Sequence, residues 1–433
     1  MGDDGAPGLD QLPHHLLQRI LQLGDFEAAD LASLEASCYT FRAATGLGPI
    51  RFKSMTENTA LQACQSDSLF KRLPHSLQSQ LAIRCNGNWK MVLRYLKAFQ
   101  QAVTGVTTYD GKVQVVAGKY LTLFIDSRGS LYGCGSNKFG VLGQELSVSE
   151  CRIPVCIQVP VPVLQVSASS HHVALVSRNG EVSTGLMFTA ALTREGEVYT
   201  WGSSSNGQLG HGDMVDQSRP VRIEALVDAG HVIQVATGPS FTFALLDCGK
   251  LYSVGGGNNY CLGHGDFSND AHPREVLFFD EQKVFVSYVA AGDEHAVAID
   301  SSGYVYTWGK GYCGPLGHGN EEDQVIPKLV EKLRDVRAVQ VSARRRKTFV
   351  VTDTSELYGF GWMGLGSLGL ENRGTSEKIL EPELVPGLRV AQVSTGNYHT
   401  VATSPEGYLK GIGDSGTSQL NFSEKFLFNT HLL

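Results

Sequence analysis

The sequence is poor in charged residues and in long apolar runs. Its 36 Lys and Arg and 43 Asp and Glu side chains make up 18% of 433 residues and give a net charge of −7. This balance excludes a protein that coats nucleic acid with its whole surface. No apolar run reaches the ~18 residues of a membrane-spanning helix, and the acidic start, MGDDGAPGLDQLP, lacks the basic and apolar regions of a secretory signal. We therefore expect a cytoplasmic or nuclear protein without a membrane partner.

Motifs that carry chemistry are also scarce. The nine cysteines are scattered without a Cys-x-x-Cys pair, and the sequence has neither a phosphate-binding loop nor a His-Glu-x-x-His motif. His172, His295 and His399 share one position of a repeat, but the same position holds leucine, phenylalanine or lysine in other copies, which a set of metal ligands would not allow. We predict free thiols, no metal site, no cofactor and no catalytic residue.

Glycine, by contrast, is abundant, with 49 residues, and it marks an internal repeat. Each copy has a small turn residue, an apolar strand, a tight turn, a second apolar strand that ends in an aromatic-Gly step, and then a Leu-Gly step. The turn position falls at Gly118, Ser169, Gly185, Gly238, Gly292, Arg344 and Gly396. Five of the six intervals are 51 to 54 residues long, and the remaining interval is 16.

The repeat predicts a closed array of small sheets. Phrases such as FTAALTREGEVYTW alternate apolar and polar residues around a turn glycine, Gly196, which is typical of two strands joined by a tight turn. A unit of ~50 residues with about four strands cannot bury both of its own faces, whereas several units arranged radially can, and they leave few free edges. The sequence therefore predicts a mainly β protein, a β-propeller.

The repeat also resembles a known family. The run Gly-Gln-Leu-Gly-His-Gly-Asp at 207–213, its variants at 263–266 and 317–320, and the Trp-Gly steps at Trp201 and Trp308 are similar to the repeats of the regulator of chromosome condensation family. The resemblance covers residues 106–433 and implies a propeller, typically of seven blades. In this fold we expect both tryptophans and the Leu-Gly glycines to serve packing and turns.

One repeat is incomplete. The second copy keeps a strand pair but lacks the aromatic-Gly and Leu-Gly steps, so that about 36 residues of the pattern are missing. We predict six complete repeats and a truncated seventh hairpin at 166–185. Either the repeat has degenerated, or a segment of an ancestral seven-repeat chain has been lost. The ring would then contract towards six blades or leave a gap with an exposed sheet edge.

Residues 1–105 lack the repeat and have helical spacing. The order Leu-Pro-x-x-Leu-Leu-x-x-Ile-Leu, followed by DLASLEASCYTFR, resembles an F-box over residues 9–50. An F-box binds a Skp-type adaptor and thereby joins a cullin–RING ubiquitin ligase. The resemblance assigns adaptor binding to Leu12, Pro13, Leu16, Ile20, Leu21, Leu31, Leu34 and Phe41. His15 departs from the family pattern, which has an acidic residue there. Residues 51–105 are predicted to form a helical linker or cap.

A cluster of positive charge interrupts the acidic chain. Arg344, Arg345, Arg346 and Lys347 replace the turn that reads Ala-Gly-Asp-Glu-His in a neighbouring copy. Four cations in one loop predict a contact with a partner, through phosphate or an acidic peptide, or a nuclear-import signal. A solvated loop without function is the alternative.

The pattern as a whole favours a non-catalytic interaction protein. We predict a substrate receptor of a Skp–cullin–F-box ubiquitin ligase, an adaptor subunit rather than an enzyme, whose propeller binds an unknown protein substrate. The alternatives are a nucleotide-exchange factor for a small GTPase and a chromatin-binding protein, both known in the resembled family. Photoreception, as in the ultraviolet-B receptor of this family, needs clustered tryptophans, and the equivalent turns here contain none.

Overall fold

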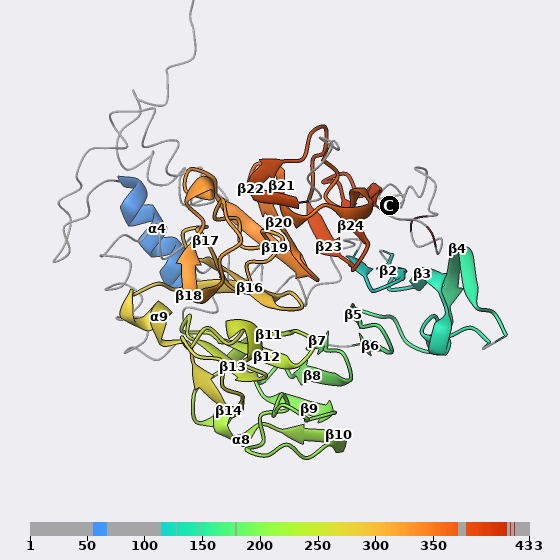
Figure 1. Cartoon of the computed structure of the whole chain (residues 1–433), viewed down its shortest axis with the longest axis horizontal. Coiled ribbons are helices and arrows are strands. Elements are labelled where there is room, and N and C mark those ends of the chain that lie inside the picture. The colour runs from blue at the N-terminus through green and yellow to red at the C-terminus, as the bar shows by residue number, and fades with distance from the viewer. Residues whose placement is uncertain are drawn as a thin grey trace, which may run out of the picture. The chain divides into compact units, whose positions relative to one another are not determined.

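The computed structural model describes residues 55–66, 114–126, 128–145, 147–177, 180–370, 378–413, 416 and 420. The chain divides into two units, residues 1–101 and 102–433. In the first unit the described element is helix α4 (Met55–Ser66), which falls in the segment predicted to be helical (Figure 1). The predicted adaptor-binding residues Leu12, Pro13, Leu16, Ile20, Leu21, Leu31, Leu34 and Phe41 lie outside the described residues.

The second unit consists of small antiparallel sheets. The first sheet contains β1 (Gln114–Ala117), β2 (Leu121–Ile125), β3 (Leu131–Ser136) and β4 (Glu150–Ile157), and a hairpin of β5 (Gln165–Ala168) and β6 (Val173–Val176) follows. The next two contain β7 (Glu181–Thr184), β8 (Phe188–Leu192), β9 (Val198–Gly202) and β10 (Gln217–Arg222), then β11 (Val232–Thr237), β12 (Phe241–Leu246), β13 (Leu251–Gly255) and β14 (Asp270–Glu275).

Three further sheets complete the unit. They contain β15 (Val286–Ala291), β16 (His295–Asp300), β17 (Val305–Gly309) and β18 (Gln324–Leu329), then β19 (Ala338–Arg344), β20 (Lys347–Thr352), β21 (Leu357–Trp362) and β22 (Lys378–Leu384), and finally β23 (Gln392–Thr395), β24 (His399–Thr403) and β25 (Leu409–Gly413). Short helical turns lie between strands: η2 (Lys138–Gly140), α8 (Glu224–Val227), η3 (Asn258–Tyr260), α9 (Leu277–Glu281), η4 (Glu331–Leu333) and η5 (Gly364–Gly366).

Each sheet is a meander, with its strands in the order of the sequence, as expected of propeller blades. The sheets follow one another around the unit (Figure 1). Gly196 adopts φ 82° between β8 and β9, which confirms the turn read from FTAALTREGEVYTW. The prediction of a mainly β propeller of six blades with an additional hairpin is therefore confirmed; the last blade has three strands among the described residues.

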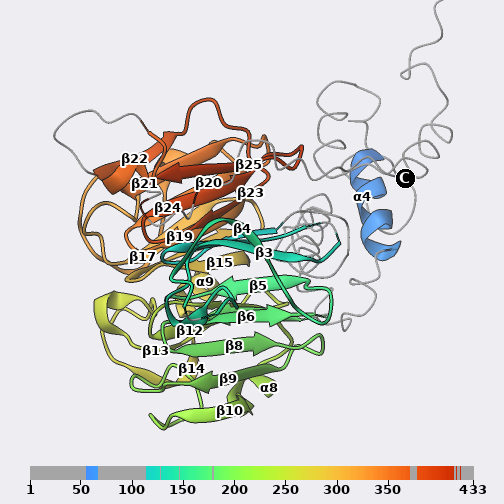
Figure 2. The ribbon, with the colours of Figure 1, turned by 90° about the vertical axis from the view of Figure 1, so that its right-hand side faces the viewer.

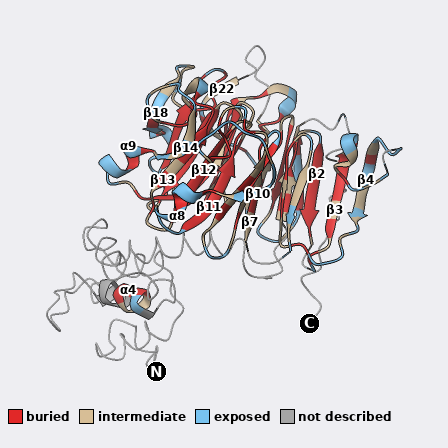
Figure 3. Cartoon of the chain, turned by 90° about the horizontal axis from the view of Figure 1, so that it is seen from below, coloured by how far each residue is buried: buried red, intermediate tan, exposed pale blue. Residues whose placement is uncertain are grey.

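The core lies between neighbouring blades. Every residue of the second strands β12, β16, β20 and β24 is buried, whereas most residues of the outermost strands are at least partly exposed, as the pale blue and tan of β4 show in Figure 3. Val297 of β16, for example, shares a buried cluster with Val341 and Phe360 of the next blade. Burial of each such side chain contributes roughly 1.5–3 kcal/mol, so a blade depends on its neighbours for stability.

The ring closes between its first and last blades. Strand β23 lies against β1, where the backbone N–H of Val115 donates to Gln392 Oε1 at 3.4 Å and that of Ala117 donates to Ser394 Oγ at 2.9 Å. The side chains of Val115, Phe124 and Val401 share a buried cluster across this junction. Residues about 280 positions apart in the sequence therefore become neighbours.

The truncated repeat keeps its own place in the ring. The hairpin lies between the first blade and β7 (Figures 1 and 2), because Val166 N–H donates to Gln114 Oε1 and Val182 N–H donates to Gln165 Oε1. Its inner strand is thus held on both sides like those of the complete blades. The described residues supply no third strand beside β6, whose four residues are all at least partly exposed. The predicted exposed edge is present there.

Candidate partner-binding face

One face of the propeller is formed by two kinds of turn. In each complete blade the first turn joins strands one and two, and the second follows strand three. Backbone hydrogen bonds hold the two together: Ser136 N–H donates to Tyr120 O at 2.8 Å, and Trp362 N–H donates to Arg346 O at 2.7 Å. Equivalent bonds recur in the blades between them. The two turns of each blade therefore lie side by side on the same face.

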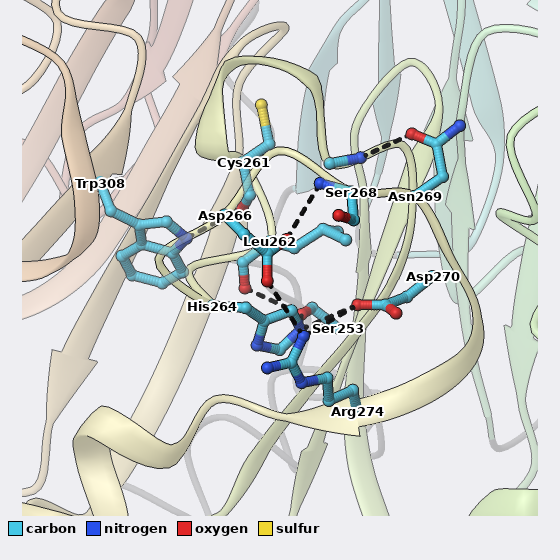
Figure 4. Close-up of polar contacts among 11 residues, drawn as sticks. Ser253, Cys261, Leu262, His264, Asp266, Ser268, Asn269, Asp270, Arg274 and Trp308 are labelled. Atoms are coloured by element: carbon cyan, nitrogen blue, oxygen red, sulfur yellow. Dashed lines mark hydrogen bonds and ion pairs between the residues drawn. The ribbon is translucent and has the colours of Figure 1, made fainter.

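The Leu-Gly-His motif shapes the second turn, as Figure 4 shows for one blade. Ser253 Oγ donates to Leu262 O at 2.8 Å, so the 2.8 Å contact with His264 Nε2 has the histidine as donor. Thr200 and Thr307 make the same pair of contacts with His211 and His318. Burial lowers the pKa of His264 to about 4, so these rings are neutral and structural at physiological pH.

The aromatic-Gly step joins this turn to the core. Trp308 is fully buried, and its Nε1 donates to Cys261 O of the preceding blade at 2.9 Å (Figure 4). Gly202 has φ 110°, and a Cβ there would lie 2.5 Å from Met187 O, so only glycine allows the two turns to approach. The predicted packing role of Trp308 is confirmed, and so is the turn role of the Leu-Gly glycines, all of which have a positive φ.

The histidines of the first turn are also structural. His295 Nε2 lies 2.9 Å from Thr348 Oγ1, and Thr348 donates its own proton to Pro315 O, so the imidazole is the donor. His399 Nε2 lies 3.1 Å from Thr122 Oγ1 of the first blade. Burial lowers the pKa of both histidines to about 3. Their shared position links neighbouring blades rather than binding a metal.

We expect His295→Phe to make the protein less sensitive to acid. The folded-state pKa lies below the ordinary 6.5, so this histidine's contribution to stability is present above pH 6.5 and is lost as the pH falls towards 3. One such group costs about 2 kcal/mol between pH 7 and pH 5. Urea unfolding at both pH values should show a loss smaller by about that amount in the variant. An unchanged loss would contradict a neutral His295.

The cationic turn is organised by ion pairs and aromatic rings. Arg344 and Arg346 lie 3.7 and 3.4 Å from Asp293 and Glu294 of the preceding blade. Arg345 has no carboxylate or other side-chain acceptor among the described residues, and its Nη1 is buried without a partner there. Its backbone N–H donates to Asp293 Oδ1, at φ 52°. The turn is thus fixed in conformation, with one guanidinium uncompensated.

The sequence predicted four cations in one loop, but the last of them, Lys347, lies in a strand and is buried. It is the first residue of β20, it is fully buried, and its Nζ donates to His399 O at 3.3 Å. The position repeats that of His295 and Phe241 in other blades, and the hairpin geometry directs it inward. Arg344, Arg345 and Arg346 are partly exposed, to different degrees: the side chain of Arg344 is 15% and that of Arg346 38% accessible, and Arg345 keeps Nη1 buried. That they contact a partner stays a prediction.

The arginines belong to a continuous series of aromatic contacts, which we call the arc. Arg346 lies 4.8 Å from the Tyr312 ring, and Arg345 lies 4.4 and 4.6 Å from the Trp362 and Tyr398 rings. Tyr398 stacks on Tyr120 at 5.3 Å. With the residues of the adjoining turns, the arc consists of Tyr120, Phe139, Tyr312, Arg344, Arg345, Arg346, Trp362, Leu365 and Tyr398. It crosses four consecutive blades, from β15–β18 to β1–β4.

Two members of the arc have an unusual backbone conformation. Phe139 (φ 67°) and Leu365 (φ 60°) are in the left-handed region, and their side chains are 61% and 58% exposed. The equivalent residue of another blade is Asn259, at φ 65°, a residue type that tolerates this conformation. A bulky apolar residue there costs of order 1–3 kcal/mol. The Phe139 ring lies 5.5 Å from the His171 ring of the β5–β6 hairpin, but both Phe139 and Leu365 leave more than half of their side chains exposed.

Among the described residues, no cluster of three or more His, Cys, Asp or Glu side chains could hold a metal ion. The seven described cysteines are free thiols, most of them buried, and Cys156 is exposed. Within the same part of the chain no helix is long and apolar enough to cross a membrane.

The sequence predicted the arginines of the arc but not Tyr120, Trp362 and Tyr398, because these residues come from three blades. Trp362 and Tyr398 meet Arg345 at the junction of two neighbouring blades. Tyr120 joins them only where the ring closes.

Comparisons with known proteins agree with this architecture. The RCC1-like domain matches residues 181–427, and the Regulator of chromosome condensation (RCC1) repeat matches residues 128–176 and 113–141. The ultraviolet-B receptor UVR8 of Arabidopsis thaliana is 32% identical over 324 residues, which are 74% of this chain and 70% of the receptor. The human E3 ubiquitin-protein ligase HERC2 is 34% identical over 235 residues, 53% of this chain but 5% of that ligase.

Solved structures show the same fold. Human WBSCR16 aligns with a TM-score of 0.59 and 22% identity over 68% of this chain and 87% of that one. Yeast RCC1 (Prp20), solved bound to Kap60, aligns with a TM-score of 0.53 and 18% identity over 72% and 71% of the two chains. A further Prp20p structure from Saccharomyces cerevisiae was described with binding to Gsp1p and histones.

Proposed function

The chain belongs to the RCC1-like family of β-propeller proteins, and on this basis we propose that it is a substrate receptor of a Skp–cullin–F-box ubiquitin ligase. Residues 9–50 bind the Skp-type adaptor, and the propeller binds the protein substrate. The propeller is a protein-interaction fold, and its side chains supply proximity rather than covalent chemistry.

The arc is the observation that carries the propeller's role. It combines Tyr, Trp and Arg side chains, the types that dominate binding energy in protein interfaces, with exposed apolar side chains on one face. Trp308 is buried and Trp362 lies against Arg345, so both tryptophans have packing roles that do not require light absorption. The F-box role is supported by the order of the leucine-rich motif at 12–21 and DLASLEASCYTFR.

Co-purification of the full chain with a Skp-type adaptor tests the proposal. We expect a stoichiometric complex with the unmodified chain and at least a tenfold loss of affinity in Leu16→Ala/Ile20→Ala, because two apolar contacts are removed from the predicted adaptor surface. Arg346→Ala, in the propeller, is the matched control and should bind the adaptor normally.

A folded chain that forms no adaptor complex would contradict the receptor role. Circular dichroism and a cooperative thermal transition establish folding in the same samples. A nucleotide-exchange factor or chromatin-binding protein would then be the better proposal, because the Prp20p structure was described with binding to Gsp1p and histones. Exchange assays with a small GTPase and binding assays with histones would distinguish these two roles.

A further inference from the structure

We propose that the arc binds an acidic peptide segment of the partner that also carries large apolar side chains. The inference rests on the propeller's proposed role as the substrate-binding part and specifies the face and the chemistry that it recognises. It is drawn from three features of the arc: its charge, its exposed apolar residues and the strained backbone that presents them.

Charge selects an acidic partner. Arg344, Arg345 and Arg346 are joined on this face by Lys119, 5.2 Å from the Tyr120 ring, and by Lys138, 5.3 Å from the Phe139 ring. Asp293 and Glu294 are the carboxylates that contact these arginines. Five cations and two carboxylates leave an excess of three positive charges, on a chain whose total is −7. A local field of the opposite sign favours an acidic segment.

Arg345 is the group best placed to receive a carboxylate. Arg344 and Arg346 already pair with Asp293 and Glu294, whereas Arg345 donates no side-chain hydrogen bond to any described residue. The rings of Trp362 and Tyr398 hold its guanidinium in one position, so little side-chain entropy remains to be lost on binding. A carboxylate that reaches this guanidinium gains a charge-assisted hydrogen bond.

Apolar anchors must accompany the acidic residues. Phe139 presents a large exposed side chain in the first blade and Leu365 in the β19–β22 blade, at backbone angles that two other blades satisfy with Asn259 and Cys313. Phe139 packs on His171 with part of its ring, yet most of both side chains stays exposed at a costly backbone conformation, which points to a role in recognition. The aromatic faces of Tyr120, Trp362 and Tyr398 are occupied by one another or by Arg345, which disfavours stacking of nucleic-acid bases and favours a peptide.

Selection of displayed peptides on the purified full chain tests the proposal. The probe is a random library of 12-residue peptides, and the enriched sequences are then synthesised and measured by fluorescence anisotropy. We expect enriched peptides to contain two or more Asp or Glu beside an aromatic or branched aliphatic residue. Affinity should fall at least tenfold in Arg345→Ala, and it should weaken with added salt.

Two further variants separate recognition from folding. Phe139→Asn/Leu365→Asn removes the apolar anchors and relieves the backbone, so peptide affinity should fall at least fivefold while the unfolding temperature is unchanged or higher. Arg334→Ala removes an exposed arginine that precedes β19, at the end of the strand opposite to the arc, and should bind the peptides like the unmodified chain.

Three outcomes would overturn the proposal: no enrichment, enrichment of basic or uncharged peptides, or peptides that bind the Arg345→Ala and Phe139→Asn/Leu365→Asn variants as tightly as the unmodified chain. Binding of a labelled oligonucleotide in place of peptides would assign the arc to nucleic acid instead. Adaptor binding is measured on the same preparations. An intact adaptor complex with failed peptide selection would therefore contradict the arc alone and leave the receptor role standing.

Discussion

Replacing Glu181 with Gln is expected to stabilise the protein by on the order of 3 kcal/mol at pH 8.5 and by little at pH 4.5. Glu181 begins the inner strand β7, and its Oε2 accepts a hydrogen bond from Val235 N–H at 3.2 Å. Burial raises the pKa of this carboxyl to about 8. Five other inner strands place Gln at the equivalent position, where Oε1 accepts the same bond: Gln114, Gln165, Gln234, Gln340 and Gln392.

The sign follows from the raised pKa. The folded state holds the proton more tightly than the unfolded chain, so the contribution of Glu181 is fully present below pH 4.5 and is lost as the pH rises through 8. A pKa difference of one is worth about 1.4 kcal/mol, so a rise from 4.5 to about 8 corresponds to at most about 5 kcal/mol. Glu181 is only partly buried, so the expected effect is smaller. Glutamine keeps the carbonyl acceptor for Val235 and cannot ionise, so the loss disappears. Urea unfolding of both proteins at pH 4.5 and pH 8.5 measures the difference.

The reciprocal variant is the control. Gln234 is buried, its Oε1 accepts from Val289 N–H, and its Nε2 donates to Val289 O. Gln234→Glu should reproduce the defect, with a larger destabilisation at pH 8.5 than at pH 4.5. Equal stability of Glu181→Gln and the unmodified chain at pH 8.5 would show that water or a cation solvates the carboxylate within the ring.

The sequence alone was sufficient to predict those elements whose signals lie within a short stretch of consecutive residues. Alternation around Gly196 predicted β8 and β9, and the 16-residue interval predicted the hairpin. It could not settle how the ring accommodates that hairpin, because the answer depends on whether its inner strand can bond to both neighbours. Gln114 and Gln165 provide those bonds, and one glutamine at a strand start carries no recognisable pattern by itself.

The candidate site was only partly predictable for a similar reason. A run of cations is visible in any sequence, whereas the stacking of Tyr120 on Tyr398 joins residues that are 278 positions apart and exists only after closure. The run of cations at 344–347 also gave a wrong prediction for its last residue, Lys347, which is buried. Charge suggests solvent exposure, but the hairpin register pairs Arg344 with Lys347 and directs the latter into the position where other blades bury His295 or Phe241.

Replacing Lys347 with Leu is therefore expected to stabilise the protein by on the order of 3 kcal/mol at pH 6. Burial, together with the nearby charge of Arg345, lowers the pKa of Lys347 to about 7. For a base with a lowered pKa, the contribution to stability is present above the ordinary 10.5 and is lost as the pH falls through 7. At pH 6 a protonated amine is buried with one carbonyl, His399 O, as its acceptor.

Leucine occupies the equivalent position in the first blade, at Leu121, and is fully accommodated there. Urea unfolding at pH 6 and pH 10 measures the effect. The gain should shrink at pH 10, where the neutral amine still donates to His399 O and the variant loses that bond.

Two controls separate charge from packing. Lys347→Arg keeps a charge that cannot be released at this pH and should destabilise the protein at both pH values. Lys332→Gln changes a lysine whose side chain is 61% exposed and should shift stability by less than about 0.5 kcal/mol. If the Leu variant were less stable than the unmodified chain at pH 6, the bonds of the buried ammonium group would contribute more free energy than its removal from water costs. The charged form of Lys347, rather than the neutral one, would then be the native link between the last two blades.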